Sequence, residues 1–117
     1  MFAYCSGLIT APELPATTLV SGCYRNMFWN CTSLSSAPEL PATTLAPRCY
    51  QQMFDNCTSL NYVNVGFTKW NPTKYSTGNW LENVSTSGTF VCPSALSIKY
   101  GIDYIPSGWT IVHPATV

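Results

Sequence analysis

Six cysteines and one histidine are the residues of this sequence that could carry nucleophilic or metal chemistry. Cys5, Cys31 and Cys57 recur every 26 residues, no C-x-x-C pair occurs, and His113 lies far away in the sequence. Zinc binding is therefore not indicated. We expect the three cysteines to stack as buried thiols that pack like small hydrophobes. A disulfide stays open as an alternative, because stacked neighbours fall near the allowed Cα separation even though they point the same way.

The acidic residues suggest no catalytic group. A nucleophilic thiol needs an adjacent base, and one histidine with five acids, Glu13, Glu39, Asp55, Glu82 and Asp103, suggests no such dyad. Glu13 and Glu39 occupy equivalent repeat positions, where a carboxylate pair could serve a glycosidase or a metal, although solvated strand-end residues are the simpler interpretation. We expect a protein that is not an enzyme, with no catalytic residue, no metal and no cofactor.

Composition excludes several classes of partner. The chain has 117 residues, of which 46% are hydrophobic and 9% charged, and its formal net charge is zero, so nothing attracts it to nucleic acid. No run of 18 apolar residues is present, and the N-terminal MFAYCSGLITAPELP has no basic start before an apolar block. We expect neither membrane insertion nor a signal peptide within this sequence.

A tandem repeat organises the chain. Shifting the sequence by 26 residues places Met1-Phe2 on Met27-Phe28 and Met53-Phe54, and the block APELPATTL at 11–19 on 37–45. With an offset of 27, a decayed copy places Trp80 on Met53 and Phe90 on Val63. These matches predict repeats over 1–92, with units 1–26, 27–52 and 53–79 and a decayed unit 80–92, followed by a C-terminal cap at 93–117 that contains the strand-like IPSGWTIVH.

Each unit is predicted to contain one short helix and one short strand. In 43–56, Leu45, Cys49 and Met53 recur at a spacing of about four, which is typical of an apolar helical face, and 17–30 repeats the pattern. The segment Leu60-x-x-Val63-x-Val65 ends with a period of two, which indicates a strand. The fold class is therefore predicted to be α/β, a leucine-rich-repeat solenoid with short helices on one side, short parallel strands on the other, and a C-terminal β cap.

The motifs MFDNCTSL and APELPATTLAPRCYQQ resemble those of the BspA-like leucine-rich repeat proteins. The resemblance is good over about 1–65, and NWLENVSTSGTFVCP extends it toward the tail, whereas the PELPATTL insert departs from the usual family repeat. It implies an extracellular or cell-surface protein that functions in adhesion or protein binding, with no catalytic residues. Similar domains occur on phage tail and fibre proteins. A virion structural role and an architectural spacer in a larger adhesin are therefore alternatives.

Polar residues beside the predicted strands are candidates for a binding face. We expect these side chains to point away from the core and to contact a protein or glycan ligand: Ser35, Ser36, Asn61, Tyr62 and Asn64. Ordinary solvated surface is the alternative interpretation. The aromatic residues Trp70, Tyr75, Trp80 and Trp109 could also contact sugars or protein, or could fill the core at the cap.

Two further sequence features lead to structural expectations. The glycosylation-like triplets that begin at Asn30, Asn56 and Asn83 are more simply explained by turn-forming asparagine. Met1-Phe2 corresponds to the middle of a repeat, which would leave an apolar edge open at the N-terminal unit. We expect either a preceding repeat or self-association to cover that edge.

Overall fold

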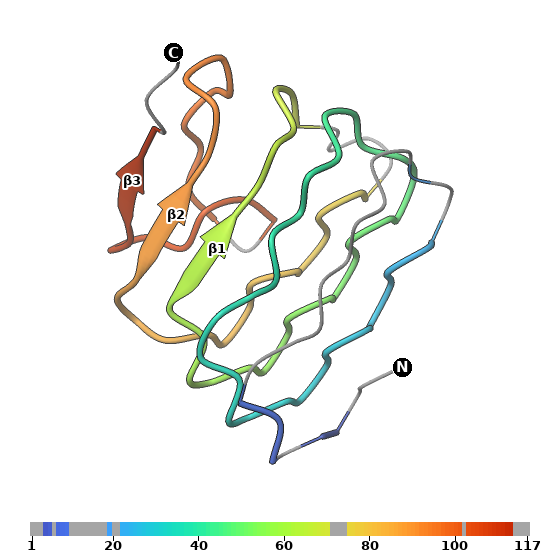
Figure 1. Cartoon of the computed structure of the whole chain (residues 1–117), viewed down its shortest axis with the longest axis vertical. Coiled ribbons are helices and arrows are strands. Elements are labelled where there is room, and N and C mark those ends of the chain that lie inside the picture. Colours follow the sequence, from blue (N-terminus) through green and yellow to red (C-terminus); the bar gives the residue numbers. More distant parts are fainter. Residues whose placement is uncertain are drawn as a thin grey trace.

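Three short parallel strands form the regular secondary structure of the computed structural model, which describes residues 4, 5, 7–9, 19, 22–70, 75–101 and 103–113. The strands are β1 (Tyr62–Asn64), β2 (Thr89–Val91) and β3 (Thr110–Val112), and they form one sheet in the order β1-β2-β3. Figure 1 shows the chain advancing turn by turn from its N-terminal part to β3 at the other end of the stack. Met1, Phe2 and Glu13 lie outside the described residues.

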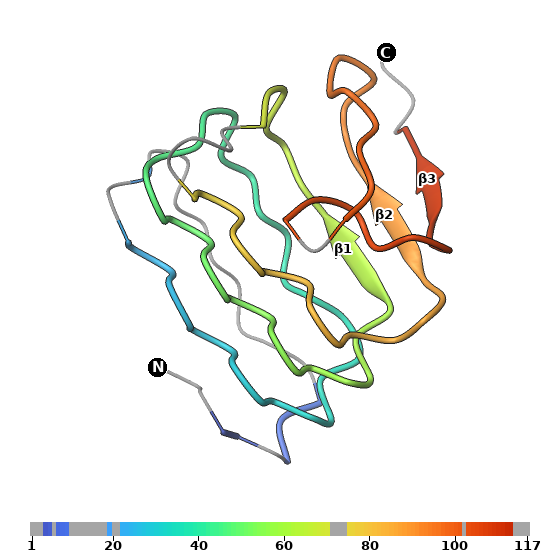
Figure 2. The same ribbon diagram turned by 180° about the vertical axis from the view of Figure 1, so that it is seen from behind.

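The side of the stack opposite the strands contains no helix among the described residues, so the predicted α/β solenoid with helices on one side is wrong. The segments 22–30 and 47–56 are runs of successive turns, seen as parallel zigzags in Figure 2. Alternate backbone N–H groups donate to the next repeat, as from Phe28 to the Met53 carbonyl at 2.9 Å and from Phe54 to the Trp80 carbonyl at 3.0 Å. The residues between them donate within their own turn, three residues back. These bonds join neighbouring repeats, whereas helical bonds would be confined to one segment.

Left-handed backbone at every fourth residue explains why these runs are not helical. In 47–56 the φ angles of Arg48, Gln52 and Asn56 are 55°, 53° and 66°, whereas a helix keeps φ near −63° throughout. Gly22, with φ 68°, begins the same pattern one repeat earlier. Buried residues also recur in strict groups of four, at 49–50, 53–54 and 57. Over so short a segment, this period resembles the helical period of about 3.6, which is why the pattern predicted a helix.

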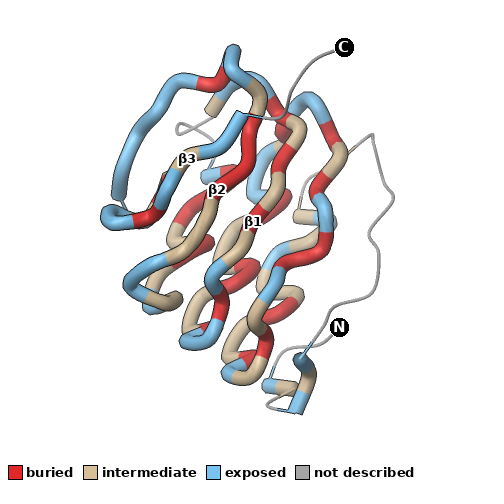
Figure 3. Tube along the Cα trace, turned by 60° about the vertical axis from the view of Figure 1, so that its left-hand side comes forward, coloured by how far each residue is buried: buried red, intermediate tan, exposed pale blue. Residues whose placement is uncertain are grey.

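The core lies between the sheet and the layer of turn runs. Leu34 and Leu60 are 0% exposed, which confirms that both face inward. From the opposite layer, the rings of Phe28 and Phe54 stack with centroids 5.6 Å apart and an interplanar angle of 2°. Equivalent residues of successive repeats thus lie on one another, and Figure 3 shows the buried positions of neighbouring turns side by side. Each large apolar side chain buried in this way contributes about 1.5–3 kcal/mol.

The decayed repeat continues the stack in the register that the sequence predicted. Val63 pairs with Phe90 across β1 and β2, which confirms the offset of 27, and Phe90 pairs in turn with Ile111 of β3. β3 lies within the strand-like segment of the tail. In the described part of the chain, no helix is long and apolar enough to cross a membrane.

Candidate functional site

The five predicted binding residues lie on two adjacent turns at the strand side of the stack. Ser36 and Asn61 are exposed, whereas Ser35, Tyr62 and Asn64 are half-buried. The Asn61 N–H donates to the Ser35 carbonyl at 3.0 Å. The structure therefore brings these residues together across neighbouring repeats, and backbone hydrogen bonds fix their spacing.

A row of hydroxyl groups crosses the outer face of the sheet. Tyr62 pairs with Thr89, and Thr89 pairs with Thr110. Ser36 lies 26 residues before Tyr62, and the N–H of its neighbour Ala37 donates to the Tyr62 carbonyl at 2.9 Å. Sequence reasoning missed two members of this row. The offset of 27 could have identified Thr89, whereas no repeat signal identifies Thr110.

The cysteine ladder is buried. Cys31 and Cys57 are 0% exposed, which confirms that part of the prediction, and Cys5 is half-buried. The Cys57 thiol donates to the Phe28 carbonyl at 3.0 Å, and burial raises its pKa to about 12. Burial likewise raises the pKa of Cys49 to about 11. Each of the six cysteines is a thiol in the structure. Since the thiolate is the nucleophile, these buried thiols are poorly reactive near neutral pH.

Cys92 and His113 lie close together but do not form a nucleophile and base. The Cys92 Sγ is 3.9 Å from the His113 Nδ1, while the same Nδ1 is 2.9 Å from the Cys92 carbonyl oxygen. A carbonyl oxygen only accepts, so Nδ1 carries a proton and cannot accept one from the thiol. Burial also raises the pKa of Cys92. No group of three or more His, Cys, Asp and Glu side chains in the described part of the chain could hold a metal ion.

The acidic residues are not gathered into a site. Glu39 is exposed, and its repeat counterpart Glu13 is not described, so the predicted pairing of these two positions cannot be placed. Asp55 and Glu82 lie on neighbouring turns, joined by the Asn56 N–H, which donates to the Glu82 carbonyl at 2.9 Å. Burial, with a smaller contribution from the Glu82 charge, raises the pKa of Asp55.

The tail aromatic residues mostly fill the core. Trp80 is 0% and Trp109 4% exposed, and their Nε1 groups donate to the carbonyls of Tyr104 and Ser85, each at 2.8 Å. Tyr75 is 56% exposed, and Trp70 is half-buried. Core filling therefore accounts for Trp80 and Trp109, while Trp70 has a surface that a ligand can reach.

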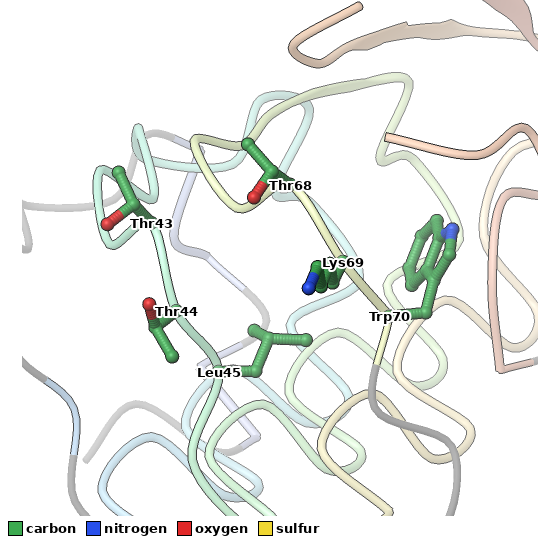
Figure 4. Close-up of a pocket in the computed structure, with 6 residues that line it drawn as sticks. All are labelled: Thr43, Thr44, Leu45, Thr68, Lys69 and Trp70. Carbon is green, nitrogen blue, oxygen red and sulfur yellow. The ribbon is translucent and has the colours of Figure 1, made fainter. Parts of the chain in front are cut away.

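Two pockets lie beside the segment 68–70. The first, of about 470 Å³, is lined by this segment and by 43–45, as Figure 4 shows. The second, of about 430 Å³, shares 68–70 and adds Ala95, Ser97 and Lys99. Three loops that are distant in the sequence build these pockets. No sequence motif marks them, because each loop contributes only one wall.

Comparison of the chain with protein-family models, with curated proteins and with solved structures found no match. Function is therefore inferred from the geometry of the described residues.

Proposed function

We propose that the chain is a non-enzymatic recognition module that binds a protein or glycan at a surface through the outer face of its strands. The observation that supports this proposal is the row of hydroxyl groups, in which consecutive turns present one polar side chain each: Ser36, Tyr62, Thr89 and Thr110. The same face includes the candidates Asn61 and Asn64. Both lie next to the row, so the polar surface spans several turns.

The spacing of this row suits an extended ligand. Neighbouring parallel strands lie about 4.8 Å apart, so successive members of the row are separated by about that distance. Inward residues alternate with the row, and Val63 and Phe90 are 0% exposed, which anchors each strand in the core. A ligand would therefore meet side chains whose backbone is already ordered, and the entropy cost of binding would be small.

The state of the cysteines supports a role in binding. The most buried thiols are protonated near neutral pH, and the contact between Cys92 and His113 has the wrong polarity for proton abstraction. An uncharged hydroxyl row instead binds through hydrogen bonds, each worth about 0.5–1.5 kcal/mol net.

The proposal is tested by screening the labelled chain against arrays of glycans and surface proteins, and then measuring the affinity of variants for the ligand found. A triple variant, Ser36→Ala, Thr89→Ala and Thr110→Ala, is expected to weaken binding by about tenfold or more through the loss of three hydrogen-bonding groups. The matched control is Thr32→Ala with Thr58→Ala, because both threonines are exposed and lie outside the row. Equal affinity of the triple variant and the control, with both folded, would contradict the proposal.

A further inference from the structure

The segment 68–70 forms a ridge between the two pockets of about 470 and 430 Å³, since Thr68, Lys69 and Trp70 line both. We propose that this ridge is a binding site for an anionic saccharide, a sugar chain that carries carboxylate or sulfate groups. The site shares no residue with the outer face of the strands. It goes beyond the recognition function proposed above and does not depend on it.

The aromatic part of the site is rigid. The Trp70 ring contacts Phe67 and Tyr104 edge-on, with centroid distances of 5.2 and 5.1 Å, and Phe90 at 6.3 Å. Its Nε1 donates to the Ser97 carbonyl at 2.8 Å, which uses its only donor. The remaining surface of the half-buried ring is apolar and fixed in place. The C–H face of a pyranose can pack against such a surface at low entropy cost.

Two cations border the same ridge. Lys69 lines both pockets and Lys99 lines the second, and both side chains are exposed. The Lys99 Nζ lies 5.4 Å from the centroid of the Tyr104 ring, which itself packs on Trp70. Among the described residues that line the two pockets none is acidic. The local charge is thus positive although the net charge of the chain is zero, and this favours an anionic ligand.

The other polar groups of the lining favour a sugar over an acidic peptide. Four lining residues carry hydroxyl groups that can both donate and accept: Thr43, Thr44, Thr68 and Ser97. Figure 4 shows that those of the first pocket come from its two opposing segments, with Lys69 between them. Peptides are commonly held by an open strand edge or by pockets for apolar anchors. The paired hydroxyls and lysines instead match the hydroxyl and anionic groups of a saccharide.

The test is calorimetric titration of the purified chain with four probes: oligogalacturonate, dextran sulfate, neutral dextran and poly-L-glutamate. We expect binding of one or both anionic saccharides, weakened by salt because the lysines are exposed, and no binding of neutral dextran. Binding of only one anionic saccharide supports the proposal and identifies the anion that is preferred. Failure of both to bind, or equal affinity for poly-L-glutamate or neutral dextran, overturns it.

Variants separate this site from general attraction of anions. Lys69→Gln is expected to lower the affinity about tenfold by removing a charge-assisted hydrogen bond, and Lys69→Arg to retain most of it. Arg25→Gln removes the same charge from an exposed residue outside both pockets and should change nothing. The triple variant of the strand face should also bind the anionic saccharide normally, so the two proposals can fail separately. An equal loss in the Lys69→Gln and Arg25→Gln variants would contradict a site at the ridge.

Discussion

The side-chain amide of Asn56 donates a hydrogen bond of 2.8 Å to the amide oxygen of Asn30, its counterpart one repeat earlier. Both residues have left-handed backbone, with φ angles of 66° and 60°. Asparagine tolerates this conformation better than most other residues. This pair therefore combines the two features that define the turn layer, a left-handed residue at every fourth position and a bond between neighbouring repeats.

Substitutions at Asn56 should separate these two contributions. Asn56→Gly retains the left-handed conformation and loses the side-chain hydrogen bond, so we expect it to lower the free energy of unfolding by about 1 kcal/mol. Asn56→Ala also carries the cost of a left-handed residue with a Cβ and should lower it by about 2 kcal/mol or more. Urea denaturation measures both values. If alanine proved no worse than glycine, the left-handed conformation of Asn56 would be wrong.

The buried thiol of Cys57 should make stability depend on alkaline pH. Burial raises its pKa from the ordinary 9.0 to about 12, so above pH 9 the unfolded chain loses a proton that the folded chain keeps. The free energy of unfolding should therefore be unaffected by this thiol below about pH 9 and fall by about 1.4 kcal/mol per pH unit between 9 and 12.

The control for this pH dependence is a second cysteine variant. Cys57→Ala should remove its share of the slope, whereas Cys23→Ala should not, because Cys23 is exposed. Denaturant melts across this pH range provide the measurement. An unchanged slope in Cys57→Ala would show that the thiol is not buried in the folded chain.

The inward and outward positions of a repeat should differ in their contribution to stability. Leu60 is 0% exposed, so Leu60→Ala should cost about 2–5 kcal/mol through lost burial and a cavity. Ser35 is half-buried, and its backbone carbonyl, which a substitution retains, accepts the Asn61 N–H. Ser35→Ala should cost under about 0.5 kcal/mol. Similar losses in thermal melts of the two variants would contradict the assigned faces.

Close packing at Gly88 ties the tail to the preceding turn. A Cβ at this position would lie 2.7 Å from the Asn61 carbonyl oxygen and 2.7 Å from Cε2 of Trp109. Gly88→Ala should therefore force a shift of backbone or ring and cost about 1–3 kcal/mol. Gly7→Ala, where nothing lies within 4 Å, is the control and should cost under about 0.5 kcal/mol. A neutral Gly88→Ala in denaturant melts would contradict the approach of Trp109.

The sequence predicted the stacking register and much of the core, because these follow from exact recurrence. The offset of 26 aligns Phe28 with Phe54, and these rings stack in the structure. The weaker offset of 27 aligns Val63 with Phe90, and these residues pair. The pairing of β2 with β3 could not be predicted, since the tail has no recurring residues from which a register can be read.

The helices were predicted wrongly because a spacing of four fits both a short helix and a run of four-residue turns. The sequence contained a signal that separates them, since asparagine recurs at the left-handed positions Asn30, Asn56 and Asn83. The interpretation of these asparagines as turn residues is confirmed for these positions. The pockets beside Trp70 could not be predicted, because their walls meet only once the turns are stacked.

The central claim is that equivalent turns of neighbouring repeats hydrogen-bond to each other and so place the strand face and the ridge at 68–70. Scalar couplings through hydrogen bonds, measured by NMR on the labelled chain, test it most directly. We predict couplings from the Phe28 N–H to the Met53 carbonyl and from the Phe54 N–H to the Trp80 carbonyl. A coupling from the Phe54 N–H to the Tyr50 carbonyl, four residues back as in an α-helix, would contradict the account.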